Sequence, residues 1–441
     1  MTTLNLAKAQ ADAPKPLWTP GEKLKIGCRL AAFMRQAGQQ GSYIDLWRWS
    51  IDNPEPFWSC VVDFCGFIGD MGKIALKDAA KMPAAQFFPD ARLNYAENLL
   101  RRSDDHPAIV FRNETGHERT LTFAQLREQV SLWQQALQRA DVGEGDRVAG
   151  YMPNLPETII AMLAAASLGA VWSSASPDFG AQGLLDRIGQ IEPKVLIAVD
   201  GYYYSGKKID CLKKVREVQP RVKGLQHTII VPFVDKDPDL KDLKDTVTAS
   251  SFTAALTPKN IAFARVAFNH PLFIMFSSGT TGPPKCIVHG HGGTLLQHLK
   301  ELQLQSDVRR DDCVFYFTTC GWMMWNWLVS ALACEATLLL YDGNPLYPDA
   351  DVLWEYTSKH KCTLFGTSAK YIDALKGSAL RPGEMHDLSS LRTICSTGSP
   401  LVHESFDYVY DAIKGDVHLA SISGGTDIVS CFVLGNPLSP V

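Results

Sequence analysis

The chain has 441 residues, of which 46% are hydrophobic and 20% are charged, and its formal net charge is −4. This composition excludes a mainly disordered, collagen-like or low-complexity protein. Because basic residues are not in excess, nucleic acid is not the expected partner. The 11 cysteines include no CxxC pair, so their spacing gives no sign of a zinc site.

The first 15 residues contain no apolar run of the kind found in secretory signals. Free cysteines without such a signal favour the reducing cytosol, and nothing indicates an obligate protein partner. Two apolar stretches, residues 158–172 and 322–341, resemble membrane spans at first sight. The first is shorter than the ~18 residues expected of a span, and the second contains Asn326 and Glu335. We therefore expect no transmembrane segment and read both as buried elements of an α/β core.

Residues 1–100 are punctuated by tryptophan and proline and are predicted to form short helices that wrap the rest of the chain. From residue 106 onward, strands and helices alternate. Thr122 and Gln125 form a predicted capping box at the start of a helix. Further helices are expected at 157–168 and 177–191. Strands are expected at 108–111, 148–152, 170–174, 195–199, 272–276, 314–317, 337–341, 363–365, 393–396, 418–421 and 429–434.

This alternation predicts βαβ units and mostly parallel sheets. The predicted fold class is α/β, with two stacked α/β subdomains. We place the first subdomain at residues 101–262 and the second, incomplete at its C-terminal end, at residues 263–441.

The strongest local motif is the segment 277–285, which reads SSGTTGPPK and follows the strand predicted at 272–276. Small residues let a backbone close tightly around an anion. Amide N–H groups and hydroxyls then point at phosphate oxygens, and a lysine adds a positive charge. The segment is therefore predicted to bind a phosphate group.

A second segment, 201–208, nearly fits the Walker A pattern. It has Lys208 where that motif needs a serine or threonine to hold magnesium. We expect a basic surface loop, although a nucleotide hydrolase that uses this loop stays open. No GxSxG sequence occurs, so a serine hydrolase lacks its nucleophile. His289 and His291 resemble a metal pair, but no third ligand has suitable spacing, and ordinary polar roles are expected.

The segment 277–285 resembles the phosphate loop of the acyl-adenylate-forming superfamily. Residues 43–98 are similar to the N-terminal segment of its acetyl-CoA synthetase branch, and residues 145–154 and 168–172 resemble the superfamily's first core motifs. Residues 321–327 and 423–427 resemble the members of this branch that act on acetoacetate. The resemblance covers most of the chain and implies the adenylate-forming N-terminal domain without its C-terminal lid.

The resemblance also implies a role for each matching residue, with Lys285 and Thr426 as catalytic groups. Cys286 stands where the superfamily usually has glycine, and Asp427, implied to bind Mg²⁺, where it usually has glutamate. The residues implied to bind ATP are Ser277, Ser278, Gly279, Thr280, Thr281, Gly282, Lys285, Gly398, Ser399, Pro400 and Thr426. Those implied to line the acid pocket are Trp322, Met323, Met324 and Gly424, and those implied to meet coenzyme A are Tyr204 and Lys207.

The implied reaction is the ATP-dependent ligation of acetoacetate to coenzyme A through an acyl-AMP intermediate. Acetyl-specific relatives have a tryptophan at the position of Gly424, so glycine there implies room for a longer acid. The chain stops at Val441, before the lid that these relatives carry, so we expect weak or absent ATP binding and little turnover from it alone. A non-catalytic binding module or another short-chain acyl-CoA synthetase stays open.

Overall fold

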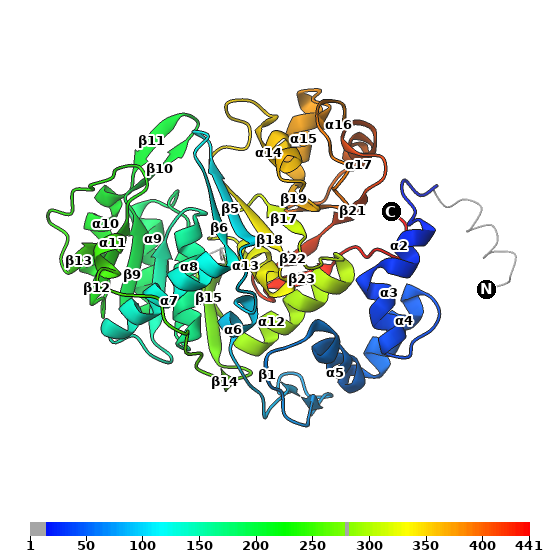
Figure 1. The fold of residues 1–441 in the computed structure, drawn as a ribbon, viewed down its shortest axis with the longest axis horizontal. Helices are drawn as coiled ribbons and strands as arrows, with labels where there is room; N and C mark the ends of the chain where they lie inside the picture. The colour runs from blue at the N-terminus through cyan, green and yellow to red at the C-terminus, as the bar shows by residue number, and fades with distance from the viewer. Residues whose placement is uncertain (1–14, 278–281) are drawn as a thin grey trace, which may run out of the picture.

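The computed structural model describes residues 15–277 and 282–441. Two seven-stranded sheets form its centre, with the strand orders β13-β12-β9-β7-β8-β15-β16 and β21-β20-β19-β17-β18-β5-β6. Neighbouring strands run parallel in both sheets, except where β16 pairs with β15 and β6 pairs with β5. The two sheets lie side by side in Figure 1, with helices packed on them. The predicted α/β fold with mostly parallel sheets is confirmed.

The strands follow the expected apolar segments closely. The first sheet contains β7 (Arg147–Tyr151), β8 (Val171–Ala175), β9 (Val195–Val199), β12 (His227–Val231), β13 (Thr246–Thr248), β15 (Pro271–Ser277) and β16 (Lys285–Gly290). The second contains β5 (Pro107–Asn113), β6 (Glu118–Thr122), β17 (Cys313–Tyr316), β18 (Thr337–Asp342), β19 (Leu364–Ser368), β20 (Thr393–Thr397) and β21 (His418–Ser421). Smaller sheets are formed by β1 (Gly69–Asp70), β4 (Arg92–Leu93) and β14 (Val266–Ala267), by β2 (Leu76–Lys77) and β3 (Gln86–Phe87), by β10 (Gly201–Tyr204) and β11 (Lys207–Asp210), and by β22 (Ser423–Gly425) and β23 (Ser430–Val433).

The expected division at residue 262 does not separate the two sheets. Strands β5 and β6 come early in the chain but join the second sheet, where Ile109 pairs with Leu338. Strands β15 and β16 come after residue 262 but join the first sheet, where Phe273 pairs with Trp172. The chain therefore crosses between the sheets twice, because the partner of a strand is set by its apolar faces and not by its nearness in sequence.

The helices begin and end where local signals place them. Thr122 and Gln125 form the predicted capping box at the start of α7, and Pro156 occupies the first turn of the almost wholly buried α8. The helices are α2 (Glu22–Gly27), α3 (Arg29–Gln36), α4 (Tyr43–Asp52), α5 (Pro54–Cys65), α6 (Tyr95–Leu99), α7 (Phe123–Arg139), α8 (Pro156–Ser167), α9 (Ala181–Ile191), α10 (Leu212–Val218), α11 (Ala249–Phe252), α12 (His291–Lys300), α13 (Met323–Val329), α14 (Val352–Lys359), α15 (Ala369–Gly377), α16 (Pro382–Met385) and α17 (His403–Tyr408). Short helical turns are η1 (Gln219–Arg221), η2 (Glu301–Gln305), η3 (Ser330–Cys334) and η4 (Val409–Ile413), of which η2 is a π-turn that continues α12.

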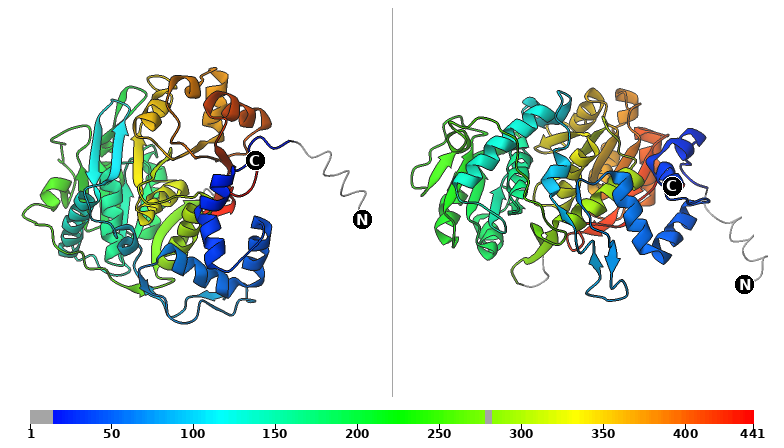
Figure 2. Two further views of the ribbon diagram at one scale, coloured as in Figure 1. Left: turned by 45° about the vertical axis from the view of Figure 1, so that its right-hand side comes forward. Right: turned by 60° about the horizontal axis from the view of Figure 1, so that its bottom comes forward.

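Short helices precede the first large sheet strand, as the sequence predicts. Helices α2 to α5 pack along one flank of the molecule, beside α12 and far from β12 and β13 (Figures 1 and 2). The backbone amide of Arg29 donates to Asp307, just beyond η2, at 2.7 Å. The indole of Trp18 donates to Asp416 at 3.0 Å, so this segment bridges parts of the chain that are distant in sequence.

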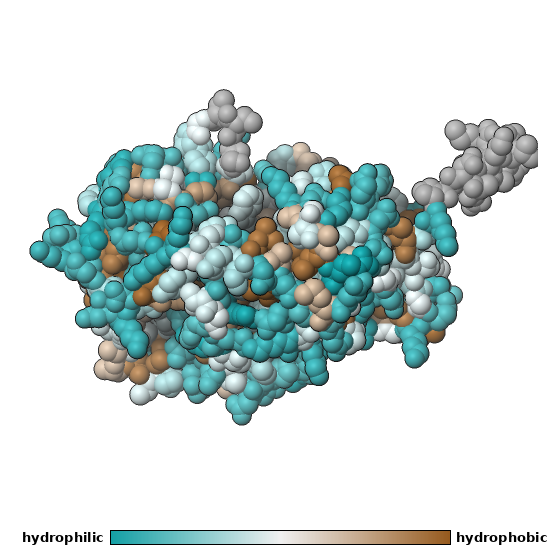
Figure 3. Space-filling model, turned by 90° about the horizontal axis from the view of Figure 1, so that it is seen from above, coloured by the Kyte–Doolittle hydropathy of each residue, from teal (hydrophilic) through white to brown (hydrophobic). Residues whose placement is uncertain are grey.

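Both apolar stretches that resemble membrane spans are buried parts of the core. Residues 158–172 lie in α8 and the start of β8, and residues 322–341 lie in α13, η3 and β18. Among the helices that the structure describes, none combines the length and the apolar character that a bilayer crossing requires. The face in Figure 3 is mostly hydrophilic, with apolar residues in small groups.

Candidate active site

The carboxyl ends of the parallel strands in the two large sheets approach each other at the segment before α13. The Ser174 hydroxyl, near the end of β8, donates to the Cys320 carbonyl at 2.6 Å. The Cys320 thiol donates to the Met152 carbonyl, just beyond β7, also at 2.6 Å. A small pocket brings residues 273–276 of β15 together with Cys320, Gly321 and Asn326. The strand before the phosphate loop therefore lines the same pocket as the segment that leads to Trp322.

The phosphate-loop motif spans the end of β15 and the start of β16. Ser277 ends β15 and pairs with Lys285, which begins β16. Gly282 has a φ of +86°, which favours glycine, and the Lys285 side chain is exposed. The other members of the motif, Ser278, Gly279, Thr280 and Thr281, lie outside the described residues.

Strand β16 has one covered face and one open face. Its register with β15 is regular from Lys285 to His289. Cys286 and Val288 are exposed, whereas Ile287 and His289 are partly buried. Because side chains alternate along a strand, Ile287 and His289 share the covered face, and Lys285 lies on the same side at the exposed start of the strand. The cysteine in the usual glycine position leaves the exit strand regular and projects from the open face.

The Thr426–Asp427 turn lies on the covered face of β16. The Nε2 atom of His289 lies 2.7 Å from the Thr426 carbonyl oxygen. Burial lowers the pKa of His289, while the bond to Thr426 and the charge of Asp427 act in the opposite direction. The turn connects β22 and β23, and the Asp427 carboxylate is exposed. Residues distant in sequence thus place a lysine, a threonine and a carboxylate around one strand.

Residues 398–400 directly follow the end of β20, whose last residues contact Ile422, just before β22. The amide of Ile422 donates to the Ser396 carbonyl at 2.7 Å, and the Thr397 hydroxyl donates to the Ile422 carbonyl at 3.3 Å. Gly398 has a φ of +87°, and Gly398, Ser399 and Pro400 are all exposed. The segment is open to a ligand beside the start of β22.

Trp322 and the methionines that follow it occupy different environments. Trp322 occupies the position just before α13 and is 70% exposed, whereas Met323 and Met324 are buried in the core. Trp322 is therefore open to solvent, and the two methionines are not.

Gly424 is confined by the neighbouring strand. It pairs with Cys431 on β23, and a Cβ atom at this position would lie 2.1 Å from the Ser430 carbonyl oxygen and 2.7 Å from the Cys431 Cα. The close approach of the two backbones requires glycine here. A Gly424→Trp variant would displace the hairpin, so it cannot test the size of the acid pocket by itself.

The Walker-like segment forms the hairpin β10–β11. The carboxylate of Glu114 accepts hydrogen bonds from the amides of Ser205 and Gly206, at 2.9 and 2.8 Å, and from the Asn344 amide at 2.9 Å. The turn amides that would have to cradle a phosphate are already bonded to a carboxylate. Tyr204 and Lys207 flank this turn and are exposed.

Sequence reasoning missed the side chains that hold the site together. His289 and His291 stand out in the sequence only as a possible metal pair. His289 contacts Thr426, and Nδ1 of His291 accepts from the Tyr95 amide at 3.1 Å. Nothing local marks Glu114 or Glu301. Within residues 15–277 and 282–441, no cluster of at least three potential ligands among His, Cys, Asp and Glu is arranged for a metal ion.

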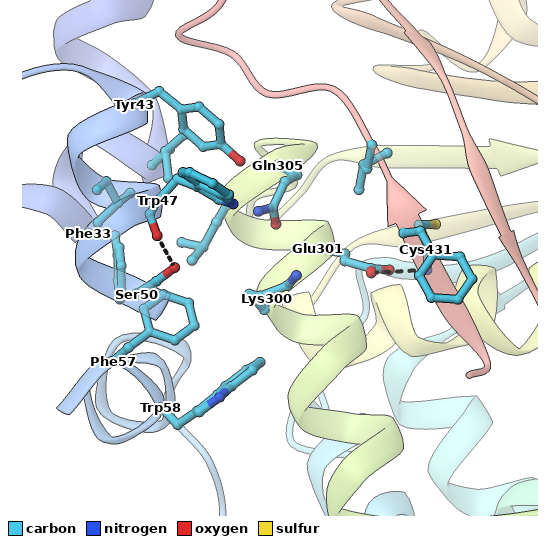
Figure 4. A pocket seen from close by; sticks show the side chains of 15 residues that line it. Phe33, Tyr43, Trp47, Ser50, Phe57, Trp58, Lys300, Glu301, Gln305 and Cys431 are labelled. Atoms are coloured by element: carbon cyan, nitrogen blue, oxygen red, sulfur yellow. Dashed lines mark hydrogen bonds between the residues drawn. The ribbon is translucent and has the colours of Figure 1, made fainter. Parts of the chain in front are cut away.

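A separate cavity of about 310 Å³ lies between the N-terminal helices and α12. Figure 4 shows aromatic side chains of α4 and α5 on one side and Lys300, Glu301 and Cys431 on the other. None of the site residues expected from the sequence lines it. The candidate active site is therefore distinct from this cavity.

A glycine- and hydroxyl-rich loop at the carboxyl edge of a largely parallel sheet defines the class of α/β nucleotide-binding proteins. Residues 96–438 match the family model described as AMP-binding enzyme, and residues 43–99 match the one described as acetyl-coenzyme A synthetase N-terminus. The chain belongs to the AMP-binding enzyme family.

Named relatives refine this family assignment. An acetoacetyl-coenzyme A synthetase of Rhizobium meliloti is 52% identical over 98% of this chain and 67% of its own length. The acetoacetyl-CoA synthetase of Mus musculus is 45% identical over 91% of this chain and 61% of its own length. The solved acetoacetyl-CoA synthetase of Streptomyces lividans superposes with a TM-score of 0.92 at 40% identity, over 97% of this chain and 67% of that one. The chain thus spans about two thirds of the length of these relatives.

Proposed function

We propose that the chain is the AMP-binding part of an enzyme that ligates acetoacetate to coenzyme A at the expense of ATP. The proposal rests on one observation: the chain is 52% identical, over 98% of its length, to an acetoacetyl-CoA synthetase. The contact of the Thr426–Asp427 turn with the strand that follows the phosphate loop supports it. Its free cysteines favour the cytosol as its location.

The reaction has two steps. A carboxylate oxygen of the acid attacks the α-phosphorus of ATP, and pyrophosphate leaves to give acyl-AMP. The thiolate sulfur of coenzyme A then attacks the acyl carbon, and AMP leaves. No enzyme nucleophile is needed, so the protein's work is to align the reactants and to neutralise charge.

Three groups of the candidate site fit the tasks of alignment and charge neutralisation. We assign Lys285 and the phosphate loop to the β- and γ-phosphates, and Thr426 to the α-phosphate. An exposed carboxylate such as Asp427 suits Mg²⁺, which binds through one or two carboxylates together with substrate phosphates. Bound there, the ion would neutralise phosphate charge.

The remaining assignments are those that the family resemblance implies. Residues 398–400 would meet the adenine, and they are exposed. Trp322, with Met323 and Met324 beside it in the sequence, would line the acid pocket, and the backbone at Gly424 would border it. Tyr204 and Lys207 would meet the 3′-phosphate of coenzyme A.

Binding of an unreactive acyl-AMP analogue tests this function without requiring turnover. We expect a sulfamate mimic of acetoacetyl-AMP to raise the melting temperature of the chain more than the acetyl mimic does, because a ligand that binds only the folded state stabilises it. A larger shift with the acetyl mimic, or no shift with either, would refute the proposed substrate.

A Lys285→Ala variant gives the matched control. It should bind MgATP about 10- to 100-fold more weakly, as expected for the loss of a charge-assisted contact. It should bind the acyl-AMP mimic as the original chain does, because that ligand has no β- or γ-phosphate. Equal losses for both ligands would contradict the assignment of Lys285.

A further inference from the structure

The segment from β16 through α12 to η2 contacts the β22–β23 hairpin at successive points. His289 contacts Thr426, His298 contacts Val429, and Glu301 contacts Ser430 and Cys431. We propose that His289 is a positioning residue that fixes the Thr426–Asp427 turn on the Lys285 face of β16, while His298 and Glu301 anchor the rest of the hairpin. This inference rests on the proposed function, because it gives the fixed turn its role in nucleotide binding.

The contact of His289 defines which ring nitrogen carries the proton. A carbonyl oxygen can only accept, so the Nε2 atom that lies 2.7 Å from it must be the donor. The ring reaches the turn from a strand whose first residue is Lys285. One hydrogen bond thus connects the strand of the phosphate loop to the backbone of the turn.

The deeper anchors are fully buried. The Nε2 atom of His298 lies 2.6 Å from the Val429 carbonyl oxygen, and its Nδ1 atom lies 2.7 Å from the Ser330 hydroxyl. The Glu301 carboxylate accepts from the Ser430 hydroxyl, from the Cys431 amide at 3.3 Å and from the Trp327 indole at 2.9 Å. Figure 4 shows Glu301 directed from its helix toward β23.

The hairpin needs such anchors because it is short. Its ladder contains the pairs Ser423–Val433, Gly424–Cys431 and Gly425–Ser430, with a register shift after the first. A two-stranded hairpin of this size is marginally stable by itself, and its adjacent glycines lose more conformational entropy on ordering than other residues would.

Fixing the turn matters because the proposed reaction depends on alignment. A displacement of a reacting or charge-neutralising group by about 1 Å can cost about 100-fold in rate. Lys285 and Asp427 would act on the same triphosphate, and no covalent or sheet connection joins their two strands directly. The hydrogen bond between His289 and Thr426 supplies such a connection.

The test compares two replacements that differ in where they place an amide donor. Gln at position 289 places its nitrogen near the position of Nε2, whereas Asn reaches only to that of Nδ1. We expect His289→Gln to stay within about 3-fold of the original MgATP affinity and His289→Asn and His289→Ala to lose about 10-fold, in line with one well-placed hydrogen bond. Val288→Ala, on the exposed face of the same strand, should change nothing.

Hydrogen exchange separates this inference from the proposed function, since it needs no nucleotide. His289→Ala and His289→Asn should accelerate amide exchange in residues 424–433, whereas His289→Gln, Val288→Ala and Lys285→Ala should not. Unchanged exchange in His289→Ala would overturn the positioning role, even if the chain binds MgATP. If exchange accelerates as expected but the original chain binds neither MgATP nor the acyl-AMP mimic, the proposed function fails and the anchoring role of His289 remains.

Discussion

Two short hairpins of the molecule differ in what their sequences indicate. The β10–β11 hairpin carries a Walker-like pattern, but its turn amides are occupied by the Glu114 carboxylate. The β22–β23 hairpin carries no such pattern, yet its turn lies beside the strand of the phosphate loop. A buried glutamate from elsewhere in the chain contacts each hairpin, Glu114 at β10–β11 and Glu301 at β22–β23. Only Glu114 occupies backbone amides that a phosphate would need. A glycine-rich pattern therefore indicates a phosphate site only where its amides are free.

Replacing Glu301, which anchors the β22–β23 hairpin, should have the largest effect on the stability of the chain. We expect Glu301→Ala to lower the free energy of unfolding by about 3–5 kcal/mol, because the Trp327 indole and the Ser430 hydroxyl would be left buried without an acceptor. Urea unfolding followed by circular dichroism measures this loss. Glu301→Gln keeps an acceptor and the shape, so it should lose less than half as much; equal losses would mean that the volume of the side chain matters and not its hydrogen bonds.

Replacing Glu114, which anchors the β10–β11 hairpin, should lower the free energy of unfolding by less, about 2–3 kcal/mol, because only backbone amides near the surface lose their acceptor. In Glu114→Ala, amide exchange should accelerate around Ser205, Gly206 and Asn344 and stay unchanged in the β22–β23 hairpin. MgATP affinity should not rise. A gain in MgATP affinity would revive the interpretation of residues 201–208 as a nucleotide loop that Glu114 blocks.

The sequence predicted what depends on neighbours in the chain. The capping box at Thr122 involves residues only three positions apart, and short apolar runs mark most strands correctly. These features could be predicted because a single short segment determines each of them. The phosphate-loop motif is likewise contiguous, and its role stays a prediction.

The anchors of the candidate site and the pairing of strands within the sheets depend on contacts between residues that are distant in sequence. His289 and Thr426 are separated by 137 positions, and Glu301 and Ser430 by 129. The same limit explains why the boundary at residue 262 does not separate the sheets: β5 pairs with β18, which follows it by more than 200 residues. No local pattern encodes these partners, so the anchors of the site became visible only in the structure.

The two adjacent glycines of the β22–β23 hairpin offer a matched comparison. We expect Gly424→Ala to destabilise the chain by about 1–2 kcal/mol, because its Cβ would overlap the Ser430 carbonyl and force the backbones apart. Gly425→Ala should be close to neutral, since no atom lies within 4 Å of the Cβ built there. Thermal unfolding of both variants measures the difference. Similar losses in both would indicate that glycine is required for the strand's conformation and not for its close contact with β23.

Replacing Lys207, an exposed lysine of the β10–β11 hairpin, should have the smallest effect on stability. We expect Lys207→Ala to change the free energy of unfolding by no more than about 0.5 kcal/mol. Lys207→Ala should nevertheless weaken coenzyme A binding about 3- to 10-fold, because it removes a positive charge from the assigned position of the 3′-phosphate. Dephospho-coenzyme A lacks that phosphate and should bind the original chain and the variant equally. Lys208→Ala is the matched control, because side chains alternate along β11 and Lys208 projects from the opposite face. Equal weakening of both ligands by Lys207→Ala would mean that Lys207 contacts another part of coenzyme A, and unchanged binding of both would leave the β10–β11 hairpin without a role in binding.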